Sequence, residues 1–187
     1  MTRVLSSRLA YDGYAKVYNV TLTEDDGSPH LRDVVDYGQS ACVLPYDRER
    51  KVALIVRTPR APLLRAGVTA QLVEAPAGMI DPGESPEITV RREAMEEAGV
   101  ELGALEPVAA CWPSPGVLAE RTHLFLATYQ AADRKGPGGG LPEEDESITV
   151  EETPLAELWR ACEQGELHDL KTLTLVFALK VRHPDLF

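Results

Sequence analysis

Residues 78–100 read GMIDPGESPEITVRREAMEEAGV, and no other segment constrains the architecture as tightly. The segment matches the pattern G-x5-E-x7-R-E-U-x-E-E-x-G-U, where U is an apolar residue, at every fixed position. These positions are Gly78, Glu84, Arg92, Glu93, Ala94, Glu96, Glu97, Gly99 and Val100. With average residue usage, a random starting point would match with a probability on the order of 10⁻⁹. The pattern therefore indicates a site and not an accident of composition.

Local signals within this segment predict a helix over Pro86–Ala98. Ser85 is a favourable N-cap residue, and a proline at the first helical position has the backbone angle that a helix needs. Gly99 suits the position just after the last helical residue. The segment thus predicts a helix that begins and ends at defined residues.

Three carboxylates share one face of this helix, because Glu93, Glu96 and Glu97 fall inside an arc of about 100°. We expect that face to be exposed, since small and apolar residues occupy the other side, namely Ile88, Ala94, Met95 and Ala98. Like charges at this spacing repel one another, so the pattern predicts a neutralising group. Hard divalent cations, Mg²⁺ in particular, bind such oxygen clusters together with water and substrate phosphates. A bare acidic helix face is more often simply solvated.

The residues before the helix predict a strand followed by a tight loop. Gln71–Ala75 reads as a strand and ends at Pro76, which has no N–H to donate to a sheet. Gly78 and Gly83 bracket the loop and allow backbone carbonyls to approach a metal. The unit is therefore a strand, a loop and a carboxylate-bearing helix.

With these glycines, Glu84 and Arg92 in place, the segment resembles the box of the Nudix hydrolases. Those enzymes cleave nucleoside diphosphates linked to another moiety and use Mg²⁺ or Mn²⁺. The resemblance implies an α/β (α+β) fold, a Nudix α/β/α sandwich with a mixed β-sheet plus a small N-terminal antiparallel β unit. It implies a metal site made by the carbonyl of Ala77 with Glu93 and Glu97. Catalytic roles would fall to Glu96 and to Arg92, which is expected to pair with Glu84 or Glu96.

Composition limits the range of possible classes and partners. A chain of 187 residues that is 44% hydrophobic can bury one good core and has room for a small accessory sheet. Its net charge of −11 argues against a nucleic-acid backbone as the main partner, because phosphate binding needs basic surface. No window approaches 18 apolar residues and the N-terminal residues lack the apolar run of a secretory signal. We therefore expect a cytoplasmic protein with no membrane span.

Three cysteines, Cys42, Cys111 and Cys162, show no C-x-x-C spacing. An odd number without metal-type spacing predicts reduced thiols in or near the core, with neither zinc nor disulfides.

The chain is expected to divide into an N-terminal β region, residues 1–38, and a Nudix hydrolase domain, residues 39–187. Tyr14–Leu22 and His30–Tyr37 alternate as the two strands of a hairpin. A lone hairpin is marginally stable, so it must pack on the main domain or on a second subunit. The hairpin resembles the dimerisation sheet of a Nudix branch, which implies a homodimer.

The main domain reads as alternating strands and helices after residue 39. Further strands are predicted at Ser40–Pro45, Lys51–Arg57, Pro107–Trp112, Thr122–Gln130 and Ser147–Glu152, and further helices at Pro154–Gln164 and about Leu170–Val181. The glycine tract at residues 136–140, GPGGG, is expected to be a flexible loop between two strands.

A proline-rich turn, Pro113–Gly116, follows the box. By itself it is an ordinary rigid turn. Beside the box, its placement resembles the ADP-ribose pyrophosphatase branch of the Nudix hydrolases, where a proline at this distance marks the substrate class. That resemblance implies that Pro115 and Glu120 contact or support the substrate.

The acidic segment after the glycine tract, residues 141–150, is the second candidate for chemistry. Such a run is usually a solvated loop, yet the helix carboxylates would be occupied by metal, so a general base must come from elsewhere. The pattern E-x-E-x-I-x-V resembles the catalytic loop of ADP-ribose and GDP-mannose hydrolases. It implies that Glu144 activates water and that Glu146 is a further metal ligand.

Arg57 and Arg60 lie at and just beyond the end of a predicted strand. A guanidinium group can bind two diphosphate oxygens at once, and the alternative for each residue is an ordinary surface arginine. The family carries a similar R-x-x-R segment, usually with an aromatic residue where this chain has Pro59. Further along, Lys171 is either a substrate contact or a solvated lysine.

The sequence predicts Mg-dependent hydrolysis of the diphosphate bond of a nucleoside diphosphate sugar of the ADP-ribose or GDP-mannose type. The products would be a nucleoside monophosphate and a sugar phosphate. Two alternatives stay open: a non-catalytic nucleotide-sugar sensor and a pyrophosphohydrolase that removes unwanted nucleoside triphosphates.

Overall fold

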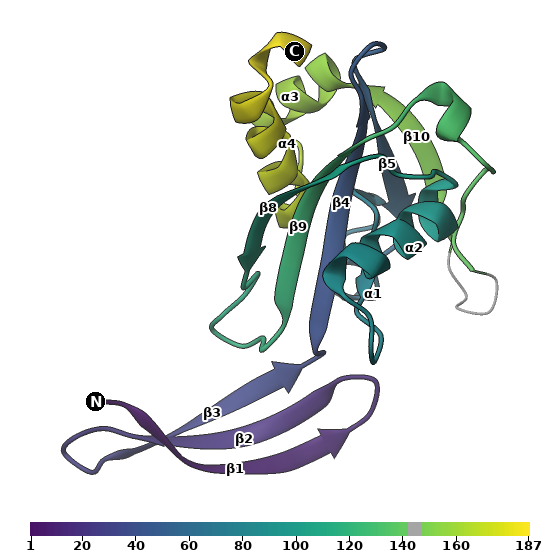
Figure 1. Ribbon diagram of the computed structural model, residues 1–187. Helices are drawn as coiled ribbons and strands as arrows, with labels where there is room; N and C mark the ends of the chain where they lie inside the picture. Colours follow the sequence, from purple (N-terminus) through teal and green to yellow (C-terminus); the bar gives the residue numbers. More distant parts are fainter. Residues whose placement is uncertain (142–146) are drawn as a thin grey trace. The chain divides into compact units, whose positions relative to one another are not determined.

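The computed structural model describes residues 1–141 and 147–187, and the chain divides into two compact units. The first unit comprises residues 1–39 and 111–122, and the second comprises residues 40–110 and 123–187 (Figure 1). The predicted domain boundary at residues 38 and 39, and the role of the N-terminal region in dimerisation, stay predictions.

A β-sheet forms the centre of the second unit. Its main path runs in the order β10-β5-β4-β9-β8, with β6 paired to β5 and β7 paired to β4. The strands are β4 (Gln39–Asp47), β5 (Val52–Thr58), β6 (Leu72–Glu74), β7 (Ala77–Met79), β8 (Leu105–Cys111), β9 (Arg121–Thr128) and β10 (Thr149–Pro154). The short strand β7 was not predicted as a strand, and it carries the first residues of the box.

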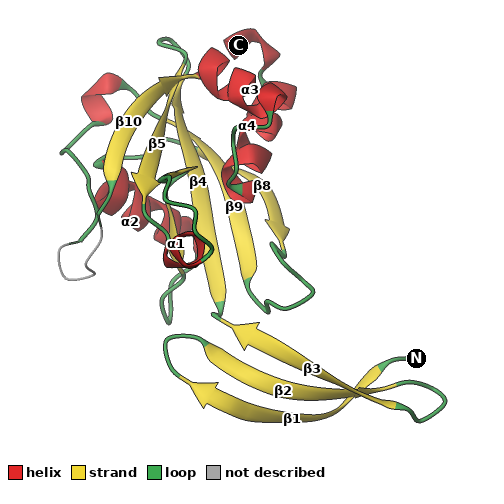
Figure 2. Ribbon diagram, turned by 180° about the vertical axis from the view of Figure 1, so that it is seen from behind, coloured by secondary structure: helices red, strands yellow, loops and turns green. Residues whose placement is uncertain are grey.

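Helices cover both faces of this sheet (Figures 1 and 2). Alternate residues of β4 separate the two hydrophobic clusters: Ala41 and Val43 pack with α2 (Pro86–Ala98), whereas Cys42 and Leu44 belong to the other cluster. That other cluster contains buried residues of α3 (Leu155–Gln164) and α4 (Leu170–Arg182). The predicted α/β sandwich is therefore confirmed, because period-two alternation feeds one core on each face.

Short helical segments complete the second unit. They are α1 (Ala61–Arg65), which was not predicted, and the 3-10 turns η1 (Ala131–Asp133) and η3 (Pro184–Leu186). No described helix is long and apolar enough to cross a membrane.

The ends of α2 follow the sequence signals. The Ser85 side chain accepts a hydrogen bond from the Ile88 N–H at 3.4 Å, and Gly99 caps the helix with φ 63°. The predicted face was wrong, however, because Ile88 is 53% exposed whereas Glu97 is 4% exposed. Glu97 is buried against the backbone of β7, a contact that helical periodicity alone does not reveal.

The glycine tract at residues 136–140 is anchored, contrary to the flexible loop that its composition predicted. Gly139 N–H donates to the Glu97 carbonyl at 2.8 Å, and Gly140 N–H donates to the Glu96 carbonyl at 3.1 Å. These are carbonyls that the last turn of a helix leaves without helical partners. The tract therefore completes the carboxyl end of α2.

The first unit is a three-stranded antiparallel sheet in the order β1-β2-β3. Its strands are β1 (Arg3–Asp12), β2 (Lys16–Thr23) and β3 (Pro29–Asp36). The predicted hairpin is present as β2 and β3, whereas β1 was missed because its residues lack clear alternation. The segment between β8 and β9 joins this unit, since Val35 N–H donates to the Val117 carbonyl at 2.9 Å.

Candidate active site

Two glutamates of α2 lie against β7. The Ala77 N–H donates to Glu97 Oε2 at 2.9 Å, which ties the end of the helix to the strand. The Glu93 carboxylate lies directly against Gly78, so closely that a Cβ on that residue would collide with it. A side chain at position 78 would therefore displace the Glu93 carboxylate, whereas the backbone angle does not call for glycine.

Arg92 contacts three carboxylates of the box. Its Nε and Nη2 donate to the two oxygens of Glu84 at 3.2 Å each, and its Nη1 donates to Glu93 at 2.8 Å and to Glu96 at 3.0 Å. Nη2 also donates to the Met79 carbonyl at 3.1 Å. The expected pairing with Glu84 or Glu96 is confirmed for both residues. One guanidinium thus donates to three carboxylates and ties the helix to its preceding loop.

The charges in this cluster stabilise one another. The hydrogen bonds to Glu84, followed by the charge of Glu93, raise the pKa of Arg92 above the usual arginine range. Reciprocally, the hydrogen bonds from Arg92 and from Thr89, whose hydroxyl lies 2.8 Å from Glu84, lower the pKa of the Glu84 carboxyl. Glu84 and Arg92 therefore favour each other's charged forms.

The donor set near β7 fits a hard divalent cation. Glu93, Glu97 and the backbone of Ala77 bring carboxylate and peptide oxygens to one strand. Within residues 1–141 and 147–187, no three His, Cys, Asp or Glu side chains meet as a complete ion site. Mg²⁺ commonly uses only one or two protein carboxylates and fills its other positions with water and phosphate oxygens. The residues present therefore suit Mg²⁺ or Mn²⁺, with substrate or water completing the coordination.

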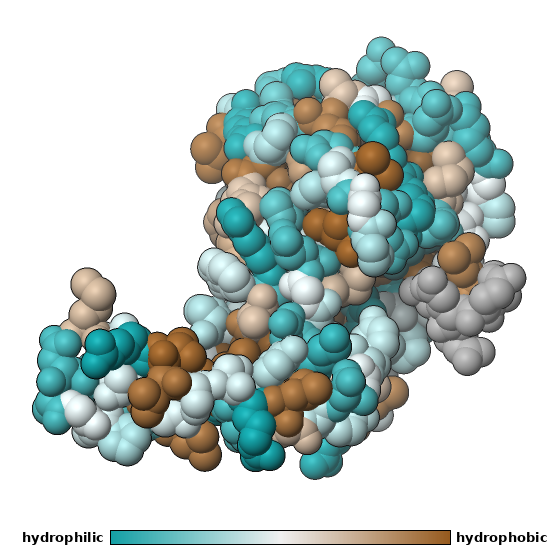
Figure 3. Space-filling view, turned by 60° about the horizontal axis from the view of Figure 1, so that its bottom comes forward, coloured by the Kyte–Doolittle hydropathy of each residue, from teal (hydrophilic) through white to brown (hydrophobic). Residues whose placement is uncertain are grey.

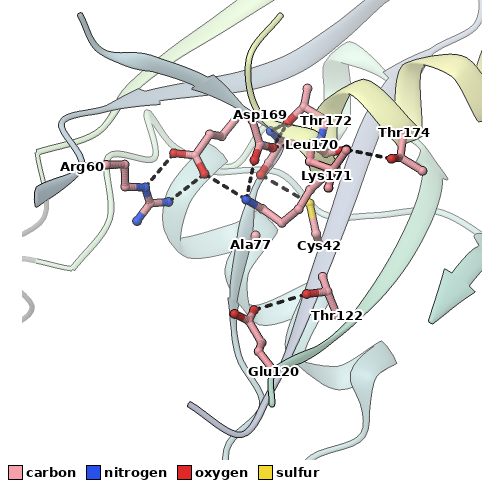
Figure 4. Close-up of polar contacts among 12 residues, drawn as sticks. Cys42, Arg60, Ala77, Glu120, Thr122, Asp169, Leu170, Lys171, Thr172 and Thr174 are labelled. Carbon is pink, nitrogen blue, oxygen red and sulfur yellow. Dashed lines mark hydrogen bonds and ion pairs between the residues drawn. The ribbon is translucent and has the colours of Figure 1, made fainter. Parts of the chain in front are cut away.

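Arg60 lies beside a buried carboxylate. Its Nε and Nη2 donate to the two oxygens of Glu74 at 2.7 Å and 3.1 Å, and Glu74 is only 2% exposed. Figure 4 shows the guanidinium with its dashed contacts. The residue was predicted to bind substrate, and the structure adds an internal partner that the sequence did not identify.

The same carboxylate holds Lys171, which is therefore not a simple solvated lysine. Lys171 Nζ lies 3.2 Å from Glu74 Oε2 and 2.7 Å from Asp169 Oδ1 (Figure 4). Burial lowers the pKa of Lys171, but the charges of Asp169, Cys42 and Glu74 outweigh burial and raise the pKa above the usual lysine range.

The N-terminus of α4 anchors this lysine. Asp169 is the N-cap, and its Oδ2 accepts from the Thr172 N–H at 2.9 Å and from the Thr172 hydroxyl at 2.6 Å. The same hydroxyl oxygen accepts from the Ala75 N–H at 2.7 Å. An unbroken series of polar contacts thus connects α4 with β6 and with the start of the box.

The other predicted site residues fall in three places. Arg57 is paired with Glu151 of β10 at 2.8 Å. Pro115 and Glu120 belong to the first unit, where Pro115 lines a cavity of about 580 Å³ and Glu120 accepts from the Thr122 hydroxyl at 3.2 Å. Glu144 and Glu146 lie outside the described residues.

Sequence reasoning missed Glu74 and Asp169 as parts of the site. A signal for Glu74 was present, because a lone carboxylate within an apolar strand must find partners if it is buried. Asp169 precedes a helix and reads as an ordinary N-cap. Neither pattern specifies Arg60 or Lys171 as the partner, because those contacts join segments that are far apart in the sequence.

Several known proteins are similar to this chain in sequence or in fold. A family model described as NUDIX domain matches residues 36–175. A GDP-mannose pyrophosphatase from Cronobacter sakazakii is 38% identical over 184 residues, covering 96% of this chain and 95% of that protein. A GDP-mannose pyrophosphatase from Escherichia coli O1:K1 / APEC is 35% identical over 185 residues, with the same coverage. A crystal structure of an ADP compounds hydrolase aligns with a TM-score of 0.76 at 18% identity, covering 97% of this chain and 96% of that chain. This last similarity concerns the fold.

Proposed function

The chain belongs to the Nudix family and is a Nudix hydrolase, and on this basis we propose that it cleaves the diphosphate bond of a nucleoside diphosphate sugar. The observation that carries the proposal is the arrangement of Glu93 and Glu97 against β7, with Arg92 holding the adjacent carboxylates. This arrangement brings hard oxygen donors to one strand and fixes them before substrate arrives.

The proposed metal site comprises Glu93, Glu97, the Ala77 carbonyl and Glu146, with Glu96 as a further candidate. When bound, Mg²⁺ or Mn²⁺ supplies neutralisation of the diphosphate charge and polarisation of phosphorus. Arg92 keeps Glu93 and Glu96 in position through hydrogen bonds of 2.8 Å and 3.0 Å. Ala77 performs the same task for Glu97 through its N–H.

Hydrolysis needs a base that is not committed elsewhere. Glu84, Glu93 and Glu96 are all bonded to Arg92, so their carboxylates already have a partner. We assign the base to Glu144, which would take the proton of the attacking water. Water attack on one phosphorus breaks the bond to the bridging oxygen and yields a nucleoside monophosphate and a sugar phosphate.

The substrate class is supported by two relatives that bear the name GDP-mannose pyrophosphatase and align over nearly their whole length. Arg57 and Arg60 are proposed to bind diphosphate oxygens, and Pro115 and Glu120 to contact or support the rest of the substrate. Arg60 is well prepared for this role, since a guanidinium already fixed by a carboxylate loses little entropy on binding.

We propose that the protein is a homodimer formed through the first unit. β1 is an edge strand in which every residue is exposed, and its apolar residues include Val4 at 63%, Leu5 at 65% and Leu9 at 43% exposure. Apolar side chains are visible among hydrophilic ones on the surface in Figure 3. An exposed edge of this kind favours pairing with another chain.

The proposed compartment is the cytoplasm. Cys42 and Cys162 are free and buried, and Cys111 is free and exposed. Thiols that remain unpaired are typical of a reducing environment.

A substrate panel tests the proposed reaction. Purified protein with Mg²⁺ is incubated with GDP-mannose, ADP-ribose, other nucleotide sugars and nucleoside triphosphates, and the products are separated and identified. We expect a nucleoside monophosphate and a sugar phosphate, and we expect Glu97→Gln and Glu144→Gln to abolish their formation. Binding of a nucleotide sugar without any product would instead indicate a sensor. Pyrophosphate released from a triphosphate would indicate a pyrophosphohydrolase that removes unwanted nucleoside triphosphates.

A further inference from the structure

We propose that Glu74 is a positioning residue that holds the Arg60 guanidinium in the orientation that binds the substrate diphosphate, an inference that rests on the proposed function. Glu74 itself contacts no reacting atom in this proposal. It acts through Arg60, and Lys171 supports it from the other side.

Glu74 is almost completely buried. A carboxylate that is 2% exposed is costly unless it is paired and hydrogen-bonded. Glu74 has both kinds of partner, because Oε1 and Oε2 together accept from Nε and Nη2 of Arg60 and Oε2 also accepts from Lys171. Two cations therefore meet at one carboxylate, and its charge is balanced before any ligand arrives.

Arg60 has more N–H donors than Glu74 uses. A guanidinium has five N–H groups in a fixed plane, and Glu74 uses Nε and one N–H of Nη2. In the part of the chain that the structure describes, no acceptor is recorded for Nη1. The Arg60 side chain is 41% exposed, so the unused donors have access to a ligand. Bonding to Glu74 thus fixes the plane of the group and leaves one edge available.

Glu74 lies close in sequence to Ala77, one of the predicted metal ligands. β6 ends at Glu74 and β7 begins at Ala77, only three residues later. Burial lowers the pKa of Arg60, but the hydrogen bonds to Glu74 and the charges of Glu74 and Glu97 outweigh burial and raise it. The guanidinium therefore lies within electrostatic range of Glu97. We propose that the substrate diphosphate would share its oxygens between a cation at Glu97 and the Arg60 guanidinium.

Lys171 and Asp169 keep Glu74 in its place. Lys171 Nζ bridges Glu74 and Asp169 at 3.2 Å and 2.7 Å, and Asp169 is fixed as the N-cap of α4. The carboxylate is therefore held by Lys171 of α4 as well as by Arg60, the N-cap residue of α1. The orientation of Arg60 is therefore fixed by these contacts, unlike that of an arginine in a mobile surface ion pair.

The test compares Glu74→Gln with a matched control, Asp47→Asn. Asp47 is also buried, at 4% exposure, and also binds an arginine, since Arg50 Nε lies 2.6 Å from its Oδ2. It lies at the β4–β5 turn and has no part in the proposed site. We expect both variants to lower Tm by several degrees, because each leaves an arginine without its buried partner.

Only Glu74→Gln is expected to weaken substrate binding. The measurements are the KM and kcat for GDP-mannose with Mg²⁺ and the Kd for GDP-mannose in EDTA, where no turnover occurs. We expect KM and Kd to rise about tenfold in Glu74→Gln with a smaller change in kcat, and to be unchanged in Asp47→Asn. In an Arg60→Ala background, adding Glu74→Gln should change KM and Kd less than about twofold, because the group that it positions is gone.

Each result decides between the possibilities. Equal Kd values for wild type, Glu74→Gln and Asp47→Asn, or fully additive effects of Glu74→Gln and Arg60→Ala, would overturn the positioning role while leaving the proposed hydrolase intact. Wild-type binding without turnover would overturn the proposed reaction, and the Kd comparison would still decide the role of Glu74. Absence of wild-type binding in EDTA together with absence of turnover in Mg²⁺ would contradict both.

Discussion

At the scale of single residues, Gly78 shows how a side chain elsewhere determines the choice of glycine. Its backbone is not in the left-handed region, and the constraint is the Glu93 carboxylate that occupies the place of a Cβ. The same glycine appears in the sequence pattern as a fixed position. The structure therefore supplies a steric reason for a residue that the sequence analysis assigned to a tight loop whose backbone carbonyls approach a metal.

We predict that Gly78→Ala lowers kcat/KM about 100-fold, because the added methyl displaces Glu93 from the metal site. Gly136→Ala is the matched control, since a Cβ there meets no heavy atom within 4 Å. Steady-state kinetics with GDP-mannose gives the two values. Equal activity of both variants would show that Glu93 is not held at Gly78 during turnover.

Asp47 provides a residue-scale test of charge and pH. Burial raises the pKa of its carboxyl, but hydrogen bonds from the Arg50 and Glu49 N–H groups and from the Arg50 side chain outweigh burial, so the net pKa is below the ordinary value of 3.8. A carboxyl with a depressed folded-state pKa stabilises the fold above its unfolded pKa. That contribution is lost as the pH falls through the folded-state pKa.

We predict that Asp47→Asn lowers the free energy of unfolding by about 2 kcal/mol at pH 7. The difference from wild type should shrink as the pH falls below 3.8, the ordinary pKa, because wild type then loses the charge as well. Urea unfolding of both proteins between pH 7 and pH 3 measures this difference in the free energy of unfolding. A difference that stays constant over this range would contradict the assigned pKa direction.

At the scale of elements, α2 is completed by a segment that lies about forty residues later. Its cap satisfies the carbonyls of Ala94 and Met95, and the glycine tract satisfies those of Glu96 and Glu97. Gly138 has φ +70°, and a Cβ there would collide with the Glu97 carbonyl. The tract needs glycine both for its backbone angle and for its close approach to the helix.

We predict that Gly138→Ala lowers the free energy of unfolding by about 2 kcal/mol, since it combines a strained backbone angle with a clash against α2. Gly136→Ala serves again as the control and should change stability by less than about 0.5 kcal/mol. Hydrogen exchange of the Gly139 and Gly140 amides should accelerate only in Gly138→Ala. Unchanged exchange would mean that the tract is not anchored in solution.

The elements also show what a sequence can predict. α2 was predicted with both its ends, because Ser85, Pro86 and Gly99 are local signals. The buried face of α2 was not predicted, because the burial of Glu97 depends on the Ala77 N–H of another element. The Arg60–Glu74 pair was missed for the same reason. Local signals specify an element, whereas partners across elements depend on packing.

At the scale of the whole molecule, the first unit should join two chains. We predict that sedimentation equilibrium gives twice the chain mass of 20.5 kDa and that Leu5→Glu combined with Leu9→Glu gives the monomer mass. The charges would lie on the exposed edge strand β1 and repel their counterparts. Val181→Glu, at a more exposed apolar position of α4, should leave the dimer intact. A monomeric wild-type protein would contradict the proposed assembly.

The central claim is that the glutamates held against β7 carry a metal-dependent diphosphate cleavage. The most direct measurement is the rate of nucleoside monophosphate release from GDP-mannose by wild type and Glu97→Gln, each with EDTA and then with added Mg²⁺. We predict turnover only by wild type and only after Mg²⁺ is added, with Glu97→Gln at least about 1,000-fold slower while its circular dichroism is unchanged. Equal rates for the two proteins, or full activity of wild type in EDTA, would contradict the claim.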